Sequence, residues 1–251
     1  MRKAALGMLM GALLVGGAAL AAAKATVPAY VAAAVADTGR PKADTDRDVG
    51  RKPAQMLVFA GIKPGTRMAE ILPGGGYFTR IFSKAVGPKG HVFAIVPPPT
   101  TEGAQTPAVQ AIAADAAYAN VSVNPQPFTT LDLPEKVDLV WTSQNYHDLH
   151  LKRFNLDVGA VNKAVFAALK PGGYYIVLDH AAATGSPVDV ADTLHRIDPA
   201  IVRREVEAAG FKYVGEDSAL RSTTDDHSKS VFDPAIRGHT DQFIYKFRKP
   251  K

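Results

Sequence analysis

The sequence predicts a doubly wound, mostly parallel α/β sheet that ends in an antiparallel pair of strands at its C-terminal edge. Short apolar runs alternate with helix-length segments from residue 53 to residue 209, and turns rich in glycine and proline separate them. Strands joined by helices of about 10–15 residues pair in parallel and carry helices on both faces. The last two apolar runs have only a long polar loop between them, so we expect them to pair antiparallel.

The first half of this pattern begins at Pro53, because proline suits the first turn of a helix. Three glycines follow the apolar run that starts at Arg67, and an amphipathic segment follows the glycines. In order, the expected elements are a helix at 53–60, a strand at 67–72, a helix at 77–86, a strand at 91–96, a helix near 107–118 and a strand near 121–123.

The second half repeats the alternation and then loses its helices. Residues 137–142 are mostly apolar, as in a buried strand, and the glycines at 172 and 173 precede another apolar run. In order, the expected elements are a strand at 137–142, a helix at 158–169, a strand at 174–179, a helix at 199–209, and strands at 212–218 and 242–247.

The N-terminus has the pattern of a cleaved secretory signal peptide. Arg2 and Lys3 precede an uncharged run over residues 4–23, which ends in small residues of the Ala-x-Ala kind. The run is long enough to span a bilayer, but it is mostly Ala and Gly and has less apolar area than a Leu-rich anchor. We therefore expect a periplasmic or secreted protein with no stable membrane association after cleavage. The expected organisation is a signal peptide at 1–25, a leader or linker at 26–52 and one domain at 53–251.

Charge and cysteine content exclude several classes of function. The formal charge of +5 falls to +2 without the first 25 residues, because these hold three bases and no acid. A charge this small argues against a protein that binds nucleic acid through its phosphates. The chain has no cysteine, which excludes a disulfide framework, a thiolate metal site and a cysteine nucleophile.

The segment Pro73-Gly74-Gly75-Gly76 is the strongest local signal for a ligand site. It lies between an expected strand and an expected helix, where backbone approaches a ligand closely or turns with positive φ. Glu70 stands at the end of the preceding strand, and the stretches 138–141 and 169–173 follow in order. This order resembles the class I S-adenosylmethionine-dependent methyltransferases.

A closer resemblance, over residues 45–249, is to a group of predicted methyltransferases that usually carry a signal peptide. The stretches that carry it are Arg47-Asp48, Pro73–Gly76, Asn145-Tyr-His-Asp148, His195-Arg-Ile-Asp198 and Ser230-Val-Phe-Asp-Pro234. The resemblance implies a seven-stranded Rossmann-like methyltransferase fold, S-adenosylmethionine as cofactor and methyl transfer to a small molecule that the sequence does not identify. It identifies the fold more specifically than the reaction.

The resemblance also implies cofactor-binding positions. Glu70 would orient the amino-acid part of the cofactor, and Tyr77 offers a ring for a cation–π contact with the sulfonium. The remaining expected cofactor residues are Gly74, Gly75, Gly76, Gln126 near the adenine, and Asn145. Two positions depart from the family pattern: Leu72 stands where the first glycine is usual, and Val96 stands where an acid usually binds the ribose hydroxyls. Valine cannot accept those hydrogen bonds.

Reactive side chains gather after the expected strands 137–142 and 174–179. Ligands of open α/β sheets bind beyond the carboxyl ends of the strands, so we expect His147 to be the general base of an acceptor and Asp148 to orient it. His180, at the end of the next strand, is the second candidate. The structural alternative is that His147 and Asp148 cap the following helix or stabilise the loop by hydrogen bonds. Methyl transfer depends mainly on alignment, and no metal is assigned for it.

Two other classes of function use the same region. His147 and His180, with nearby His and Asp residues, offer ligands for a zinc-type hydrolase, although no glutamate base stands at the usual helical spacing. A non-catalytic secreted binding protein on a methyltransferase fold is the third possibility, and Val96 favours it. The clusters at 195–198 and 225–230 are interpreted as structural, with Asp198 capping a helix and the second cluster in a solvated, salt-bridged loop. The functional alternative is that Arg196 and Arg237 clamp an anionic substrate and that Asp225, Asp226 and His227 bind a metal.

Overall fold

The computed structural model describes residues 26–99 and 106–251. The expected signal peptide at residues 1–25 lies outside the described residues. In the part of the chain that the structure describes, no helix has the length and apolar character needed to cross a membrane.

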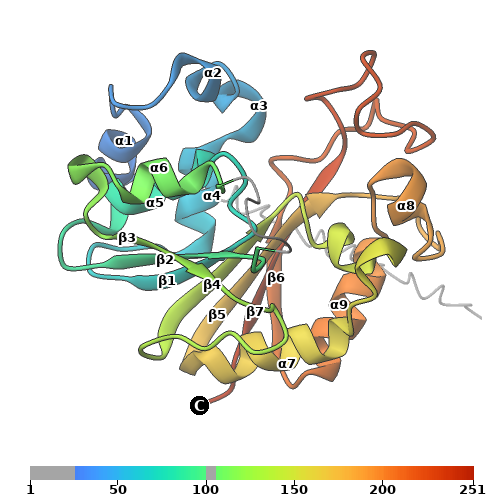
Figure 1. The fold of residues 1–251 in the computed structure, drawn as a ribbon. Helices are drawn as coiled ribbons and strands as arrows, with labels where there is room; N and C mark the ends of the chain where they lie inside the picture. The colour runs from blue at the N-terminus through green and yellow to red at the C-terminus, as the bar shows by residue number, and fades with distance from the viewer. Residues whose placement is uncertain (1–25, 100–105) are drawn as a thin grey trace, which may run out of the picture.

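One seven-stranded sheet forms the centre of the protein, in the order β3-β2-β1-β4-β5-β7-β6 (Figure 1). The first five strands pair in parallel, and β7 pairs antiparallel with both β5 and β6. The strands are β1 Arg67–Ile71, β2 His91–Val96, β3 Val121–Pro125, β4 Val137–Ser143, β5 Leu169–His180, β6 Lys212–Asp217 and β7 Gln242–Arg248. The predicted fold class, including its antiparallel C-terminal edge, is confirmed.

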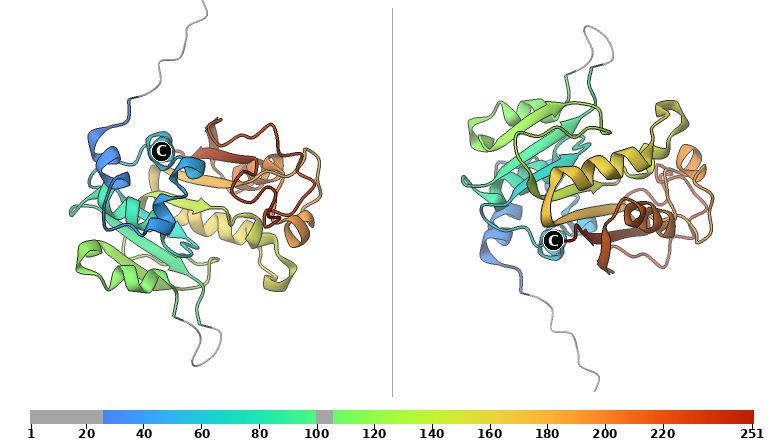
Figure 2. Two further views of the ribbon diagram at one scale, coloured as in Figure 1. Left: turned by 90° about the horizontal axis from the view of Figure 1, so that it is seen from above. Right: turned by 90° about the horizontal axis from the view of Figure 1, so that it is seen from below.

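Helices cover both faces of the sheet, as Figure 2 shows from above and below. The helices α1 Ala29–Val35, α4 Pro53–Ala60, α5 Tyr77–Val86 and α6 Val109–Ala113 bury their apolar side chains in one core cluster. The helices α7 Val158–Ala168 and α9 Pro199–Ala208 pack into a second cluster on the opposite face. The short helices are α2 Lys42–Thr45, α3 Asp48–Arg51, α8 Val190–Leu194, and the 3-10 helices Ala116–Tyr118, His147–His150 and Lys152–Phe154.

Residues 26–52 are not an exposed leader or linker in this structure. Val31 and Ala34 of α1 are buried in the first core cluster, so this segment contributes to the core before α4 begins. The Arg40 guanidinium bonds both oxygens of Asp48 at 2.7 and 2.8 Å, which fixes α3 relative to the loop before α2. Helix α1 packs on α4 and α5, whereas α2 and α3 contact Arg80 and Tyr77 of α5, near the carboxyl end of β1.

Two expected helices differ at their ends for local reasons. The segment expected to be helical near 107–118 divides into α6 and a 3-10 turn, because the Asp115 side chain accepts a hydrogen bond from Ala117 N at 2.8 Å and starts a new turn. Helix α7 ends at Ala168, one residue early, because Leu169 already pairs with Val137 in the sheet. Strand β5 consequently includes the glycine turn expected before it.

Candidate functional site

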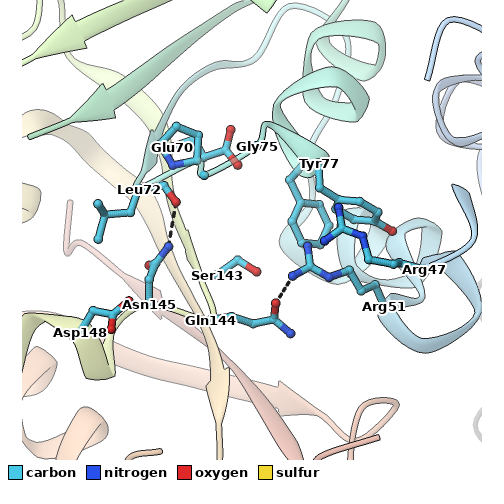
Figure 3. Close-up of a pocket in the computed structure, with 13 residues that line it drawn as sticks. Arg47, Arg51, Glu70, Leu72, Gly75, Tyr77, Ser143, Gln144, Asn145 and Asp148 are labelled. Atoms are coloured by element: carbon cyan, nitrogen blue, oxygen red, sulfur yellow. Dashed lines mark hydrogen bonds between the residues drawn. The ribbon is translucent and has the colours of Figure 1, made fainter. Parts of the chain in front are cut away.

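A polar cleft of about 420 Å³ opens where the chain reverses its direction across the sheet, between β1 and β4 (Figure 3). This topological switch point is where open α/β sheets bind ligands. The turn after β1 forms one wall and the loop after β4 forms the other. The lining residues are Arg47, Arg51, Glu70, Leu72, Pro73, Gly74, Gly75, Tyr77, Phe78, Ser143, Gln144, Asn145 and Asp148.

The turn after β1 has the backbone of a ligand-binding glycine loop. Gly74 and Gly76 have φ values of 56° and 78°, in the left-handed region that favours glycine. Leu72 has a φ of 53°, so the backbone keeps a glycine-like conformation at the position where the family pattern has glycine. The Leu72 carbonyl accepts a hydrogen bond from Asn145 Nδ2 at 2.8 Å, which joins the two walls (Figure 3).

Glu70 lies at the base of the cleft, where the sequence predicted a cofactor-binding acid. Its side chain is 3% exposed, and its Oε2 accepts a hydrogen bond from Thr79 Oγ1 at 2.5 Å. Burial raises the pKa of this carboxyl from 4.5 to about 7, although the Thr79 hydroxyl and the charge of Arg51 act in the opposite direction. A cation bound in the cleft would restore the ionised form.

Two arginines that were not predicted as site residues from the sequence form a basic wall opposite Glu70. Arg51 and Arg47 lie over the Tyr77 ring, with Cζ atoms 4.5 and 4.9 Å from its centroid (Figure 3). Burial and the neighbouring Arg47 lower the pKa of Arg51 to about 10, and its guanidinium donates to Gln144. The Tyr77 ring, expected to face a sulfonium, therefore already contacts arginines. Both arginines come from residues 26–52, and only the stretch Arg47-Asp48 in the family resemblance pointed to them.

A second, apolar pocket of about 290 Å³ adjoins the polar cleft, and Leu72 and Asp148 line both. The other lining residues are Pro97, Pro98, Gln126, Pro127, Phe128, Leu149, Phe154 and Leu156. Gln126, predicted to lie near the adenine, lines this pocket, and its Oε1 accepts a hydrogen bond from Asp132 N at 2.6 Å. Val96 is 4% exposed and belongs to the core, so it offers no polar group at the end of β2.

His147 and Asp179 form a buried pair at the end of β4 and β5. His147 Nδ1 lies 2.8 Å from Asp179 Oδ1, and His147 N donates to Asp179 Oδ2 at 2.7 Å. Burial lowers the pKa of His147, but the charges of Asp179 and Asp148 and the hydrogen bond to Asp179 outweigh it, so the pKa lies above its usual value. A carboxylate at Nδ1 fixes the tautomer that leaves the Nε2 lone pair free.

Asp148 and His195 complete a cluster with His147. Asp148 Oδ1 lies 3.4 Å from His147 Nε2 and 3.7 Å from His195 Nδ1. His195 is the C-cap of α8 and has a φ of 52°, in the left-handed region that histidine adopts more often than most side chains. In the sequence, His195 stands out only as part of a stretch that carries the family resemblance, because no local pattern indicates its proximity to residue 148.

His180 lies apart from this cluster. Its Nδ1 is 2.8 Å from Thr240 Oγ1, and its ring centre is 6.1 Å from that of His147. Burial lowers the pKa of His180 to about 4, with Arg196 and His147 contributing, so it is neutral at ordinary pH. It lines a third cavity of about 400 Å³, with Asp46, Arg47, Val49, Gly50, Arg51, Gln144, Val231, Phe232, Arg237, Gly238, His239 and Gln242.

The sequence prediction is correct for Asp198 and wrong for the 225–230 cluster, whose ion pair with Arg196 is buried and is not a solvated surface pair. Asp198 Oδ1 accepts from Ala200 N at 2.9 Å and caps α9. Arg196 is fully buried, and its guanidinium pairs with Asp225 at 2.8 Å. These contacts anchor the long loop between β6 and β7 against the loop before α9.

Comparison with known proteins identifies the fold. No protein-family model and no curated protein match the sequence. A SAM-dependent methyltransferase from Aquifex aeolicus superposes with a TM-score of 0.59 at 18% identity, over 82% of this chain and 95% of that one. The glycopeptide N-methyltransferase MtfA in complex with S-adenosylmethionine gives 0.54 at 14%, over 82% and 87%. The N-methyltransferase NodS from Bradyrhizobium japonicum WM9 gives 0.53 at 14%, over 82% and 97%. The chain has the fold of class I S-adenosylmethionine-dependent methyltransferases.

Proposed function

We propose that this protein is an S-adenosylmethionine-dependent methyltransferase that acts on a small molecule. The observation that carries the proposal is the two-part cleft at the switch point, with a polar half beside the glycine turn and an apolar half beside Gln126. The cofactor has a zwitterionic amino-acid end and an adenosine end, so it has the same division of polarity. Solved methyltransferases of this fold, one of them in complex with S-adenosylmethionine, support the proposal.

The polar half fits the amino-acid end of the cofactor. Arg51 and Glu70 line the same cleft, so it offers a cation to a carboxylate and an acid to an ammonium group. Gly75 has open space on its Cβ side, which lets a ligand approach the backbone of the turn. Charge-assisted hydrogen bonds of this kind are about twice as strong as neutral ones.

The apolar half fits adenine, with one departure. Proline, leucine and phenylalanine side chains line it, and the Gln126 amide NH₂ has no hydrogen-bond partner among residues 26–99 and 106–251. Val96, at the position where the family pattern has an acid for the ribose hydroxyls, has no side-chain acceptor. Losing hydrogen bonds to a charged acceptor costs about 1.5–3 kcal/mol, so we expect cofactor binding weaker than in relatives that keep the acid.

The third cavity is the best place for the methyl acceptor. It shares Arg47, Arg51 and Gln144 with the polar cleft, so the two cavities adjoin. It lies between α3 and the loop before β7, which rise from the same end of the sheet in Figure 1. Its volume of about 400 Å³ suits a small molecule. When bound, S-adenosylmethionine supplies an activated methyl group, and the chain must align the acceptor with it.

Calorimetric titration of S-adenosylmethionine and of its demethylated product tests the proposal. Saturable binding is expected in the wild type. Gly75→Glu places a carboxylate in the cleft and should weaken binding strongly, whereas Gly75→Gln, of the same size, should weaken it less because it carries no charge. Equal affinities in the wild type and Gly75→Glu, with both folded, would contradict the proposed cofactor site. A folded wild type that binds neither compound would favour the non-catalytic binding protein.

Export is part of the proposal and rests on residues 1–25 alone. Arg2, Lys3 and the following uncharged run have the pattern of a cleaved signal. Cell fractionation with N-terminal sequencing of the purified protein is the test. A mature N-terminus near residue 25 in the periplasm or medium is expected, and an intact N-terminus in the cytosol would refute export.

A further inference from the structure

We propose that His147, Asp148 and His195 bind one divalent transition-metal ion, and that this ion holds an oxygen of the methyl acceptor. The three residues come from two separate parts of the chain, the loop after β4 and the end of α8. One ligand atom from each lies within 4.8 Å of the others. The role of the ion in methyl transfer rests on the proposed function, but its binding does not.

The separations of the ligand atoms suit a metal ion. Two ligands at about 2.1 Å from zinc, at a tetrahedral angle, lie roughly 3.4 Å apart. Asp148 Oδ1 is 3.4 Å from His147 Nε2 and 3.7 Å from His195 Nδ1. These contacts are longer than good hydrogen bonds between the same groups, which measure about 2.7–2.9 Å. The side chains therefore need only small rotations to enclose an ion.

The surroundings of His147 are those of a metal-binding histidine. Ligating histidines usually donate their other ring N–H to a carboxylate, which fixes the tautomer and raises the basicity of the ligating nitrogen. Asp179 does this at Nδ1, is fully buried, and is itself held by the backbone N–H groups of His147 and His180 at 2.7 Å. The same arrangement would also orient His147 as a general base. Other residues near His147 must therefore show whether it is a metal ligand or a base.

His195 provides that distinction. A general base oriented by Asp179 needs no second imidazole, yet His195 Nδ1 lies 3.7 Å from the Asp148 carboxylate and within 4.8 Å of the ligand atom of His147. Phe232 packs edge-on against the His195 ring, with centroids 4.8 Å apart, and holds it in place.

The donor set indicates the class of ion and of acceptor. Two imidazoles and one carboxylate, with no cysteine in the chain, suit zinc, iron(II) or a similar ion and leave coordination positions open. Asp148 lines both halves of the cofactor cleft, and Phe232 lines the third cavity. The ion would thus lie beside both the cofactor cleft and the third cavity, which favours an acceptor with a hydroxyl or carboxylate oxygen near the methylated atom.

For a hydroxyl acceptor the atoms balance simply. Binding to the ion lowers the pKa of the hydroxyl, and its proton leaves to solvent. The acceptor oxygen then forms the new bond to the methyl carbon, and the carbon–sulfur bond of the cofactor breaks with its electron pair going to sulfur. His147 acts in this arrangement as a ligand and not as a base.

Metal titration of the purified protein, stripped with a chelator, tests the site without any need for activity. Zn²⁺ is titrated by calorimetry and Co²⁺ by its visible absorption, which reports coordination geometry. The expected result is one ion per chain. His195→Asn and Asp148→Asn should each weaken Zn²⁺ binding at least roughly 100-fold, since loss of a mere outer partner already costs about 10–100-fold. Asparagine is chosen at 195 because it tolerates a left-handed backbone.

His91→Asn is the matched control. His91 starts β2 at the opposite end of the sheet and is bonded to Ser122 Oγ at 2.9 Å, so its replacement should leave Zn²⁺ affinity unchanged. No stoichiometric Zn²⁺ or Co²⁺ binding, or binding that survives both His195→Asn and Asp148→Asn, would overturn the proposal. Titration with S-adenosylmethionine is run separately. Cofactor binding without metal binding refutes this inference alone, and metal binding without cofactor binding refutes only the proposed function.

Discussion

Replacing Glu70 with glutamine should change how the stability of the protein depends on pH. Glutamine keeps the shape of the side chain and removes its ionisation. In the folded protein the pKa of Glu70 is raised from 4.5 to about 7, chiefly by burial. The folded state therefore binds a proton that the unfolded chain releases between these two pH values, and the stability contributed by Glu70 is present below pH 4.5 and is lost as pH rises through 7.

The magnitude follows from the size of this change. The interval from 4.5 to about 7 corresponds to about 3 kcal/mol, at about 1.4 kcal/mol per pKa unit. The unfolding free energy of Glu70→Gln minus that of the wild type should thus increase by about 3 kcal/mol between pH 4.5 and pH 7.5. Other carboxyl groups titrate in both proteins and cancel in the difference.

Urea titrations at a series of pH values measure this difference. The single tryptophan, Trp141, is fully buried and reports unfolding by fluorescence. Because Trp141 pairs with Glu70 in the sheet register, a substitution at residue 70 can change its fluorescence directly. Unfolding should therefore also be followed by circular dichroism. Glu207→Gln, at an exposed position of α9, is the control and should give a flat difference. A flat difference for Glu70→Gln as well would refute the argument that burial governs this carboxyl.

Three further results are expected from other parts of the structure. Gly76→Ala should lower the unfolding free energy, measured by thermal melts, by roughly 2 kcal/mol, because the residue has a φ of 78° and a Cβ would collide with an isoleucine of α6. Gly75→Ala should lose less stability, because its Cβ would enter open space. Equal losses in the two variants would contradict this prediction. Arg51→Gln should weaken S-adenosylmethionine binding roughly 10- to 100-fold by calorimetry, the loss of one charge-assisted hydrogen bond; unaltered affinity would remove Arg51 from the site. Asp225→Asn should lower the unfolding free energy in urea titrations by about 3–5 kcal/mol, because its arginine partner is fully buried. Asp46→Asn, in an exposed pair, should lower it by under about 1 kcal/mol. A small loss for Asp225→Asn would show that the loop it anchors is not essential to the fold.

Much of the candidate site could be predicted from local sequence. A run of glycines after a strand has few conformations available, so Pro73–Gly76 identified the turn, and Glu70 followed from its place at the strand end. His147, Asp148 and Asn145 follow a buried strand, and the rule that ligands bind beyond strand carboxyl ends placed them at the cleft. The structure puts all of them in the lining of the cleft except Gly76 and His147, and His147 is buried beside the cleft against Asp179.

Residues 26–52 could not be placed in the same way. Their sequence lacks the regular period of a long helix, and α1, α2 and α3 span seven, four and four residues. Short helices of this kind are stabilised by tertiary contacts more than by propensity. Arg51 reaches the cleft because α3 is fixed by the contacts of Asp48 with Arg40 and with the Tyr77 hydroxyl, at 2.6 Å for the latter.

The sequence by itself determined the alternation of strands and helices, the antiparallel edge and the glycine turn, because these depend on neighbouring residues and on side-chain periodicity. The tertiary structure decided which distant side chains meet. His195 and Asp148 are far apart in the chain, and their 3.7 Å separation depends on how α8 packs against the loop after β4. Contacts of this kind arise from the crossovers of the fold and leave no local pattern, so the arginine wall and the His147–Asp148–His195 cluster became visible only once the chain was folded.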